Sequence, residues 1–248
     1  MGKVEQCRET LAGMPRDQWD SFLQAGSNLP GPRANLELAW AAADIASEGQ
    51  ARTWLEKDQP ALGTDDPRSF LTFIATITLG GLIAEGRTSW LKTLRALASD
   101  GRWRIREAVC MALGRIGGAD RALMHGIAEN WATGNLLEAR AAAAGVADPD
   151  LAKHPEFAST AVGVLDLATR KVAEAADTKS EDYRTLKQGL SYCWSVVAVA
   201  CPAETKPAME AWFASENAGV KQIMKEDLKK NRMAKSEPEW TATWLKRL

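Results

Sequence analysis

Apolar residues along the chain recur with the period of an α-helix rather than with the alternation of a strand. Within residues 103–118, Ile105, Val109 and Ile116 belong to one continuous apolar stripe. The segment just upstream, 90–97, repeats this pattern before a short turn, so the two segments predict an antiparallel helical hairpin. Alternating β-branched and aromatic runs between turn pairs are missing. We therefore predict an all-α fold.

The start of the predicted helix over 103–118 carries a feature that recurs along the chain. An apolar or small residue followed by a cation lies just inside a predicted helix at Ile105–Arg106, Ala139–Arg140, Tyr183–Arg184 and Val220–Lys221. The intervals are 34, 44 and 37 residues, and a polar turn precedes each copy. A period near 40 with two helices per unit is typical of HEAT-like repeats, because one hairpin must bury its apolar face against the next. The pattern predicts an α-solenoid, or superhelix, of HEAT-like antiparallel helix pairs.

We expect this solenoid to form a single domain over residues 1–248, with ten to twelve helices. The N-terminal third shows helical periodicity more loosely, with proline-containing turns between its segments, and the C-terminal helices are expected to form a cap. Two uncharged runs, Ser69–Ala84 and Gly189–Ala203, contain hydroxyl or glycine residues and are too short to span a bilayer. They predict buried helices, and no membrane partner is expected.

Charge is segregated along the chain although the formal net charge is only -1. Residues 87–115 hold seven cations against two carboxylates, a net charge of +5, and residues 221–248 hold eight against four, a net of +4. Residues 35–82 have a net charge of -4. Two basic segments on one concave surface would neutralise several phosphates of a nucleic acid. The alternative is that they are solvated helix faces on which like charges happen to cluster.

The repeated cations and the tryptophans beside them are the candidate ligand-binding residues. Arginine suits phosphate because its planar guanidinium donates in a fork, and tryptophan stacks on bases, sugars or cations. The alternative is structural: the cations bond turn carbonyls or carboxylates of a neighbouring unit, and the tryptophans fill the core between hairpins. Trp103, between two arginines at a helix start, is the one expected to be exposed. The candidates are Arg102, Trp103, Arg104, Arg106, Trp131, Arg140, Arg184, Trp194 and Lys221.

Residues with catalytic or metal-binding chemistry do not form a recognisable motif. The cysteines, Cys7, Cys110, Cys193 and Cys201, include no CxxC pair and have no histidine at zinc-ligand spacing, so we expect reduced thiols, no metal and no cofactor. The two histidines are expected in loops or at the surface, and no glycine-rich phosphate loop follows a strand. The N-terminus lacks the apolar stretch of a secretory signal. These features predict a cytoplasmic protein whose catalytic residues, if any, are unidentified.

Four segments resemble a family of uncharacterised bacterial HEAT-repeat proteins that is related to the HEAT-like-repeat alkylpurine DNA glycosylases. These segments are "LPGPRANLELAWAAAD" (29–44), "SDGRWRIREAVCMALGRIG" (99–117), "LSYCWSVVAVACP" (190–202) and "KEDLKKNRMAK" (225–235). For the glycosylase branch, the resemblance implies a basic concave face that holds a DNA duplex, with aromatic residues and a carboxylate around the damaged nucleotide. The glycosylase signature is a Trp–Asp pair with a second Asp one turn later. Only Trp19–Asp20 begins in that way here, and position 23 is leucine.

Two hypotheses about function follow from these patterns. The leading one is a non-enzymatic HEAT-repeat scaffold that binds a macromolecule, either a protein segment or a nucleic-acid backbone, in a concave and partly basic groove. The other is a DNA-repair protein that resembles the alkylpurine glycosylases and binds duplex DNA, either as an active enzyme that hydrolyses the N-glycosidic bond of alkylated bases or as a degenerate member that only recognises lesions. Affinity for duplex DNA that weakens steeply with salt would favour the second hypothesis.

Overall fold

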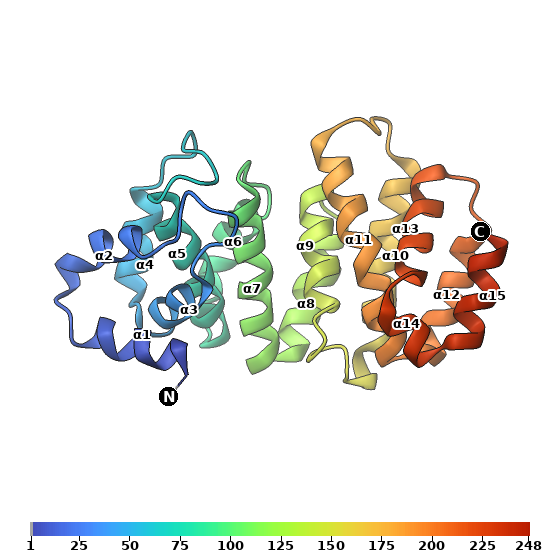
Figure 1. The fold of residues 1–248 in the computed structure, drawn as a ribbon, viewed down its shortest axis with the longest axis horizontal. Coiled ribbons are helices and arrows are strands. Elements are labelled where there is room, and N and C mark those ends of the chain that lie inside the picture. The colour runs from blue at the N-terminus through green and yellow to red at the C-terminus, as the bar shows by residue number, and fades with distance from the viewer. Residues whose placement is uncertain (1) are drawn as a thin grey trace. The chain divides into compact units, whose positions relative to one another are not determined.

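The computed structural model describes residues 2–248, and over that range every regular element is a helix (Figure 1). The prediction of an all-α fold is therefore confirmed. Residues 2–248 contain fifteen α-helices and three short 3-10 helices, so the expected number of ten to twelve was wrong. Part of the difference comes from Pro202 and Pro238, each of which starts a new helix directly after the preceding one.

Contacts within the chain divide it into two compact units, one ending at Ala119 and the other running from Asp120 to Leu248. That all 248 residues form one solenoid domain stays a prediction. Within residues 2–248, no helix combines the length and the apolar character that crossing a bilayer requires.

The first unit is organised around one helix that is buried along almost its whole length. The α-helices of this unit are α1 (Lys3–Ala12), α2 (Trp19–Ala25), α3 (Leu36–Ile45), α4 (Glu48–Glu56), α5 (Ser69–Ala84), α6 (Leu91–Leu97) and α7 (Trp103–Ala119). The buried helix is α5, which contacts α2, α3, α4, α6 and α7. Gly80 brings it close to α7. It coincides with the first uncharged run, so the predicted buried helix is confirmed there.

The second unit consists of helix pairs whose members contact their counterparts in the next pair. Its α-helices are α8 (Arg121–Ala132), α9 (Leu136–Val146), α10 (Ala158–Glu174), α11 (Glu181–Ala200), α12 (Pro202–Phe213), α13 (Ala218–Leu228), α14 (Asn231–Ser236) and α15 (Pro238–Arg247). Helices α9, α11 and α13 pack side by side in that order, and α8, α10 and α12 do the same (Figure 1). Each helix of one row also contacts its partner in the other row.

Polar side chains fix where the helices of the α9–α11–α13 row begin. Asn135, Ser180 and Asn217 each accept hydrogen bonds from backbone N–H groups in the first turn of the helix that follows. Three of the polar turns that define the sequence repeat therefore end at helix starts. The C-terminal part of α10 lies beside two of these starts, because Lys171 donates to Gly134 O at 2.6 Å and Asn217 donates to Ala173 O at 3.1 Å.

Candidate functional site

In the first unit, Arg102 lies just before α7 and holds two carboxylates that are distant from each other in sequence. Its guanidinium donates to both oxygens of Asp58, at 2.8 and 2.7 Å, and to both oxygens of Asp100, at 2.9 and 2.7 Å. Only 4% of the residue is exposed. These hydrogen bonds tie the loop after α4 to the turn before α7.

The Asp58 carboxyl is stabilised in its charged form by this network. Burial acts to raise the pKa of Asp58, but hydrogen bonds from Arg102 and Thr72 outweigh burial and hold the pKa below its usual value. Thr72 Oγ1 donates to Asp58 Oδ1 at 2.6 Å. Asp58 is therefore a charged anchor for Arg102 at neutral pH.

The next two arginines are also buried and bonded within the first unit. Arg104 donates to Gly31 O at 2.6 Å and to Asp65 Oδ1 at 2.9 Å. Arg106 donates to the carbonyl oxygens of Asp100 and Gly101, at 2.7 and 3.1 Å. These contacts close loops onto the start of α7, which is the structural role considered for the cations. A ligand-binding role for Arg102, Arg104 and Arg106 stays a prediction.

Trp103 is the exposed member of this group, as expected from its position. Its exposed fraction is 46%, and the guanidinium carbon of Arg104 lies 4.3 Å from the centroid of its ring. The arginine covers part of the aromatic surface, and the rest faces solvent. Trp131 and Trp194 differ from it, since both are buried in the second unit and Trp194 Nε1 donates to Thr169 Oγ1 at 3.0 Å.

Three of the four repeat cations contact the turn before their own helix, two through backbone carbonyls and one through a carboxylate. Arg106 reaches back to the carbonyls of Asp100 and Gly101, Arg184 donates to the carbonyl of Lys179, and Lys221 Nζ lies 2.9 Å from Glu216 Oε2. Each partner lies five or six residues before the cation, in the turn that precedes the helix. The repeat therefore has a clear local role: the cation closes the turn at the start of its helix.

Unlike Arg102, Arg104 and Arg106, the repeat cations of the second unit lie at or near the surface. Arg184 is exposed, while Arg140 and Lys221 are half-buried. Arg140 lies against α11, because a Cβ atom placed on Gly189 would be 3.2 Å from Arg140 Cγ. Lys187 of α11 in turn donates to Gln222 of α13 at 3.0 Å. Helix α11 therefore contacts a side chain of α9 at Gly189 and a side chain of α13 at Lys187.

The basic C-terminal segment was predicted from its charge, but Tyr192, beside which two of its cations lie, was missed by the sequence analysis. Tyr192 of α11 is 43% exposed, with Arg232 Cζ 4.3 Å and Lys230 Nζ 6.0 Å from its ring centroid. Lys225 and Lys229 are exposed on α13 and at its C-terminal end, one and two turns beyond Gln222. The only acidic residue among residues 225–232 that is not fully buried is Glu226, which pairs with Lys229 at 2.8 Å. We call Tyr192, Lys225, Lys229, Lys230 and Arg232 the basic patch.

A signal for Tyr192 was present in the sequence. Tyr192 falls inside the uncharged run Gly189–Ala203, which predicts a buried helix, so its exposure was not expected. On α11, however, Arg184, Gln188 and Tyr192 recur every four residues, which places all three on one helix face. All three are exposed.

Beneath the basic patch lies a buried carboxyl group, Asp227 of α13. Its Oδ1 accepts a hydrogen bond from the backbone N–H of Ser195 at 2.8 Å, one turn after a kink in α11 at Ser191. Its Oδ2 has no hydrogen-bond partner, and the residue is fully buried. Burial raises the pKa of Asp227 well above the usual value, since the charged form loses its hydration.

Replacing Asp227 with asparagine is expected to change how stability depends on pH. An acid with a raised pKa in the folded state binds its proton more tightly there than when unfolded, so the wild type loses stability as the pH rises above the ordinary aspartate value of 3.8. Asparagine keeps an acceptor for Ser195 N–H and does not ionise, so it does not lose stability as the pH rises. We expect Asp227→Asn to have a higher Tm than the wild type at about pH 8 and a similar Tm near pH 4.

Asp227→Ala provides the matched control, because it removes the acceptor and leaves Ser195 N–H unpaired at every pH. Its unfolding free energy should fall by about 1–3 kcal/mol across the whole range. A Tm of Asp227→Asn below that of the wild type at about pH 8 would contradict the assignment of a buried, proton-binding carboxyl.

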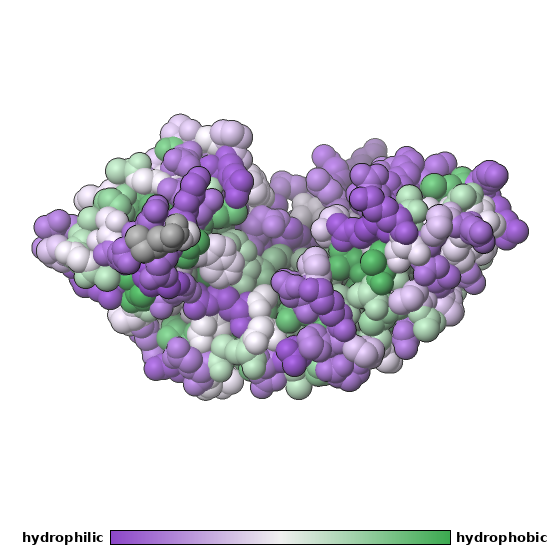
Figure 2. Space-filling view, turned by 60° about the horizontal axis from the view of Figure 1, so that its bottom comes forward, coloured by the Kyte–Doolittle hydropathy of each residue, from purple (hydrophilic) through white to green (hydrophobic). Residues whose placement is uncertain are grey.

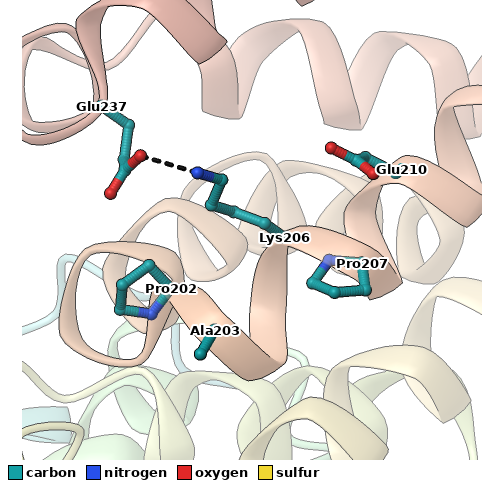
Figure 3. A pocket seen from close by; sticks show the side chains of 6 residues that line it. All are labelled: Pro202, Ala203, Lys206, Pro207, Glu210 and Glu237. Carbon is teal, nitrogen blue, oxygen red and sulfur yellow. Dashed lines mark hydrogen bonds and ion pairs between the residues drawn. The ribbon is translucent and has the colours of Figure 1, made fainter.

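A pocket of about 440 Å³ lies between α12 and the start of α15 (Figure 3). Lys206 points across it toward Glu237, with 2.8 Å between Nζ and Oε2, and the rings of Pro202 and Pro207 line it. Glu210 accepts hydrogen bonds from the indoles of Trp240 and Trp244, at 2.6 and 3.3 Å. Lys206 and Glu210, which line this pocket, already have partners within the chain. Their contacts hold the C-terminal helix α15 against α12.

The groups that carry most catalytic chemistry are engaged in packing. His125 is buried against Phe157, with 4.5 Å between ring centroids, and burial lowers its pKa, so it is neutral. His125 was predicted in a loop or at the surface, and that prediction was wrong because the residue lies on α8 and its ring fills the space beside Phe157, in the short helical turn before α10. Within residues 2–248, no three His, Cys, Asp or Glu side chains are grouped so as to hold a metal ion.

Both side chains of the Trp–Asp pair suggested by the glycosylase resemblance, Trp19 and Asp20, also have partners within the chain. Trp19 is fully buried and donates to Leu11 O at 3.2 Å. Asp20 accepts a hydrogen bond from Trp54 Nε1 at 2.7 Å and pairs with Lys57 at 3.2 Å. The contacts of Asp20 join α2 to α4 and its C-terminal end. Base excision stays a prediction, and no carboxylate is assigned to it.

The surface in Figure 2 is a mixture of residue types, with hydrophobic residues in small patches between hydrophilic ones. The four cysteines are free thiols, and Cys193 and Cys201 are buried.

Comparisons with protein families, with curated proteins and with solved structures gave no match to this chain.

Proposed function

We propose that the chain is a HEAT-like helical-repeat scaffold that binds the backbone of a nucleic acid through the α9–α11–α13 row of its second unit. The repeat architecture is supported by the order of contacts, in which successive helix pairs stack in two rows. Repeat proteins of this kind extend one row of helices as a binding surface.

The basic patch is the observation that carries the proposal. Its four cations lie near one another on α13 and around the start of α14, with Glu226 as the only carboxylate among residues 225–232 that is not fully buried. Lys225 and Lys229 are exposed, Lys230 and Arg232 are half-buried, and Lys229 pairs with Glu226. Four cations against one such carboxylate leave a local excess of positive charge, which attracts phosphates and releases counterions on binding. Arg102, Arg104 and Arg106 of the first unit are buried and already hold carboxylates or carbonyls, which favours the second unit as the binding surface.

Reversing charge in the basic patch tests this proposal. The double variant Lys225→Glu/Lys229→Glu should bind a fluorescently labelled oligonucleotide at least ~10-fold more weakly than the wild type, because two phosphate contacts are replaced by repulsion. The measurement is fluorescence anisotropy at low salt. Thermal unfolding of the variant checks that it remains folded, as expected for two exposed positions.

The matched control is Lys153→Glu/Arg170→Glu, which makes the same change in net charge outside the α9–α11–α13 row. Lys153 lies in the loop after α9 and Arg170 lies on α10, and each is exposed and pairs with an aspartate. This control should stay within about 2-fold of the wild type, apart from the general effect of net charge. Equal weakening in both variants, or no binding by the wild type at low salt, would overturn the proposal and favour a protein partner.

A further inference from the structure

Tyr192 stands out among the described residues because its ring is large, apolar and open to solvent. Among residues 2–248, only Trp103 and Tyr192 are large hydrophobic side chains with substantial exposure. An exposed aromatic ring that is flanked by cations can stack on a flat ligand while the cations bind its charged groups. Tyr192 lies where α11 is kinked, directly after Ser191.

The groups around Tyr192 match the two parts of a nucleotide. Arg232 lies over the ring at 4.3 Å, and Lys230 lies 6.0 Å from the ring centroid, so both cations are placed beside an aromatic platform. An unpaired base stacks on tyrosine or on a guanidinium plane, while lysine and arginine bind the phosphates that flank it. In a duplex the faces of the bases are covered by their neighbours, so a surface tyrosine finds no free base to stack on.

The buried Asp227 is compatible with an anion above it. Asp227 lies close enough to Lys230 and Arg232 to interact electrostatically with both. Since burial raises its pKa, the carboxyl holds a proton more readily than an exposed aspartate, which reduces its repulsion of a phosphate. Its hydrogen bond from Ser195 also fixes the turn of α11 that carries Tyr192.

We propose that the basic patch is a single-strand-selective site, in which Tyr192 stacks on an unpaired base while Lys230 and Arg232 contact the adjoining phosphates. This inference rests on the proposed function and assigns the class of nucleic acid: single-stranded DNA or RNA rather than a duplex. The two kinds of strand present the same stacking faces and phosphates, so the site binds both.

The test compares a labelled oligo(dT) of about 20 nucleotides with a duplex of the same length, by anisotropy at one low salt concentration. We expect the wild type to bind the single strand at least ~5-fold more tightly. Tyr192→Ala should weaken oligo(dT) binding by about 5- to 100-fold and change duplex binding less than about 2-fold. Tyr192→Phe keeps the ring and should retain most of the affinity.

The outcomes separate this inference from the proposed function. Equal affinity for both forms, or an unchanged affinity of Tyr192→Ala for oligo(dT), overturns the single-strand site. If Lys225→Glu/Lys229→Glu still weakens binding in that case, the proposed function stands. Failure of the wild type to bind either form overturns both. An oligo(U) probe of the same length should bind like oligo(dT), and its failure to bind would contradict recognition through stacking and phosphates alone.

Discussion

Replacing Arg102 with alanine is expected to lower the free energy of unfolding by about 3–5 kcal/mol. The side chain is nearly fully buried and bonds both oxygens of Asp58 and of Asp100. Its removal leaves two largely buried carboxylates without their main partner, and one of them holds a loop that is 44 residues away in sequence. Urea unfolding at neutral pH, followed by circular dichroism, measures the loss.

Arg68→Ala is the matched control for this prediction. Arg68 also pairs with an aspartate, Asp66, but its side chain is 57% exposed, so the variant should lose less than about 1 kcal/mol. The pKa of Asp58 is lowered in the folded state, so the contribution of Asp58 is present at neutral pH and lost as the pH falls through that lowered value. The difference between wild type and Arg102→Ala should therefore shrink in acid. Equal losses for Arg68→Ala and Arg102→Ala would contradict the account.

Gly80→Ala is expected to destabilise the first unit by about 1–3 kcal/mol or more, although alanine is the better helix former. A Cβ atom at position 80 would lie 2.5–2.9 Å from the backbone O, Cα and C atoms of Ala112. Those atoms belong to α7 and cannot rotate away, so α5 and α7 would have to move apart along a buried interface. Chemical unfolding of the variant measures the effect.

Gly163→Ala provides the comparison, because Gly163 also lies inside a helix but a Cβ atom there would have no atom of another helix within 4 Å. This variant should be more stable than the wild type by up to about 1 kcal/mol, through the helix propensity of alanine alone. A Gly80→Ala variant that is as stable as Gly163→Ala would show that α5 and α7 do not approach as closely as described.

Local features of the fold were predictable because their causes are local. Asn135, Ser180 and Asn217 cap helices with their own side chains, and the long uncharged run over residues 69–84 predicts the buried helix α5. The number of helices was wrong in part because Pro202 and Pro238 each start a new helix, and this local signal was not used to divide the C-terminal segment. The stacking of pairs into a single solenoid over both units stays a prediction.

The candidate site was predictable only in part, because its chemistry depends on contacts that are distant in sequence. The arginine-rich start of α7 has the composition of a phosphate site, yet Arg102 and Arg104 bond Asp58 and Asp65 from another loop. The basic C-terminal segment was recognised by its charge. Its aromatic partner Tyr192 comes from α11, and no local pattern joins that residue to Arg232.

The salt dependence of nucleic-acid binding tests the central claim most directly. The affinity of the wild type for oligo(dT) is measured by anisotropy between about 50 and 200 mM salt, where each neutralised phosphate contributes a slope of about -0.7 for a single strand. If the cations of the basic patch neutralise phosphates, the affinity should fall at least ~10-fold over this range. The slope of log affinity against log salt concentration should be shallower for Lys225→Glu/Lys229→Glu than for the wild type. Affinity that does not change with salt would contradict binding of a nucleic-acid backbone by this surface.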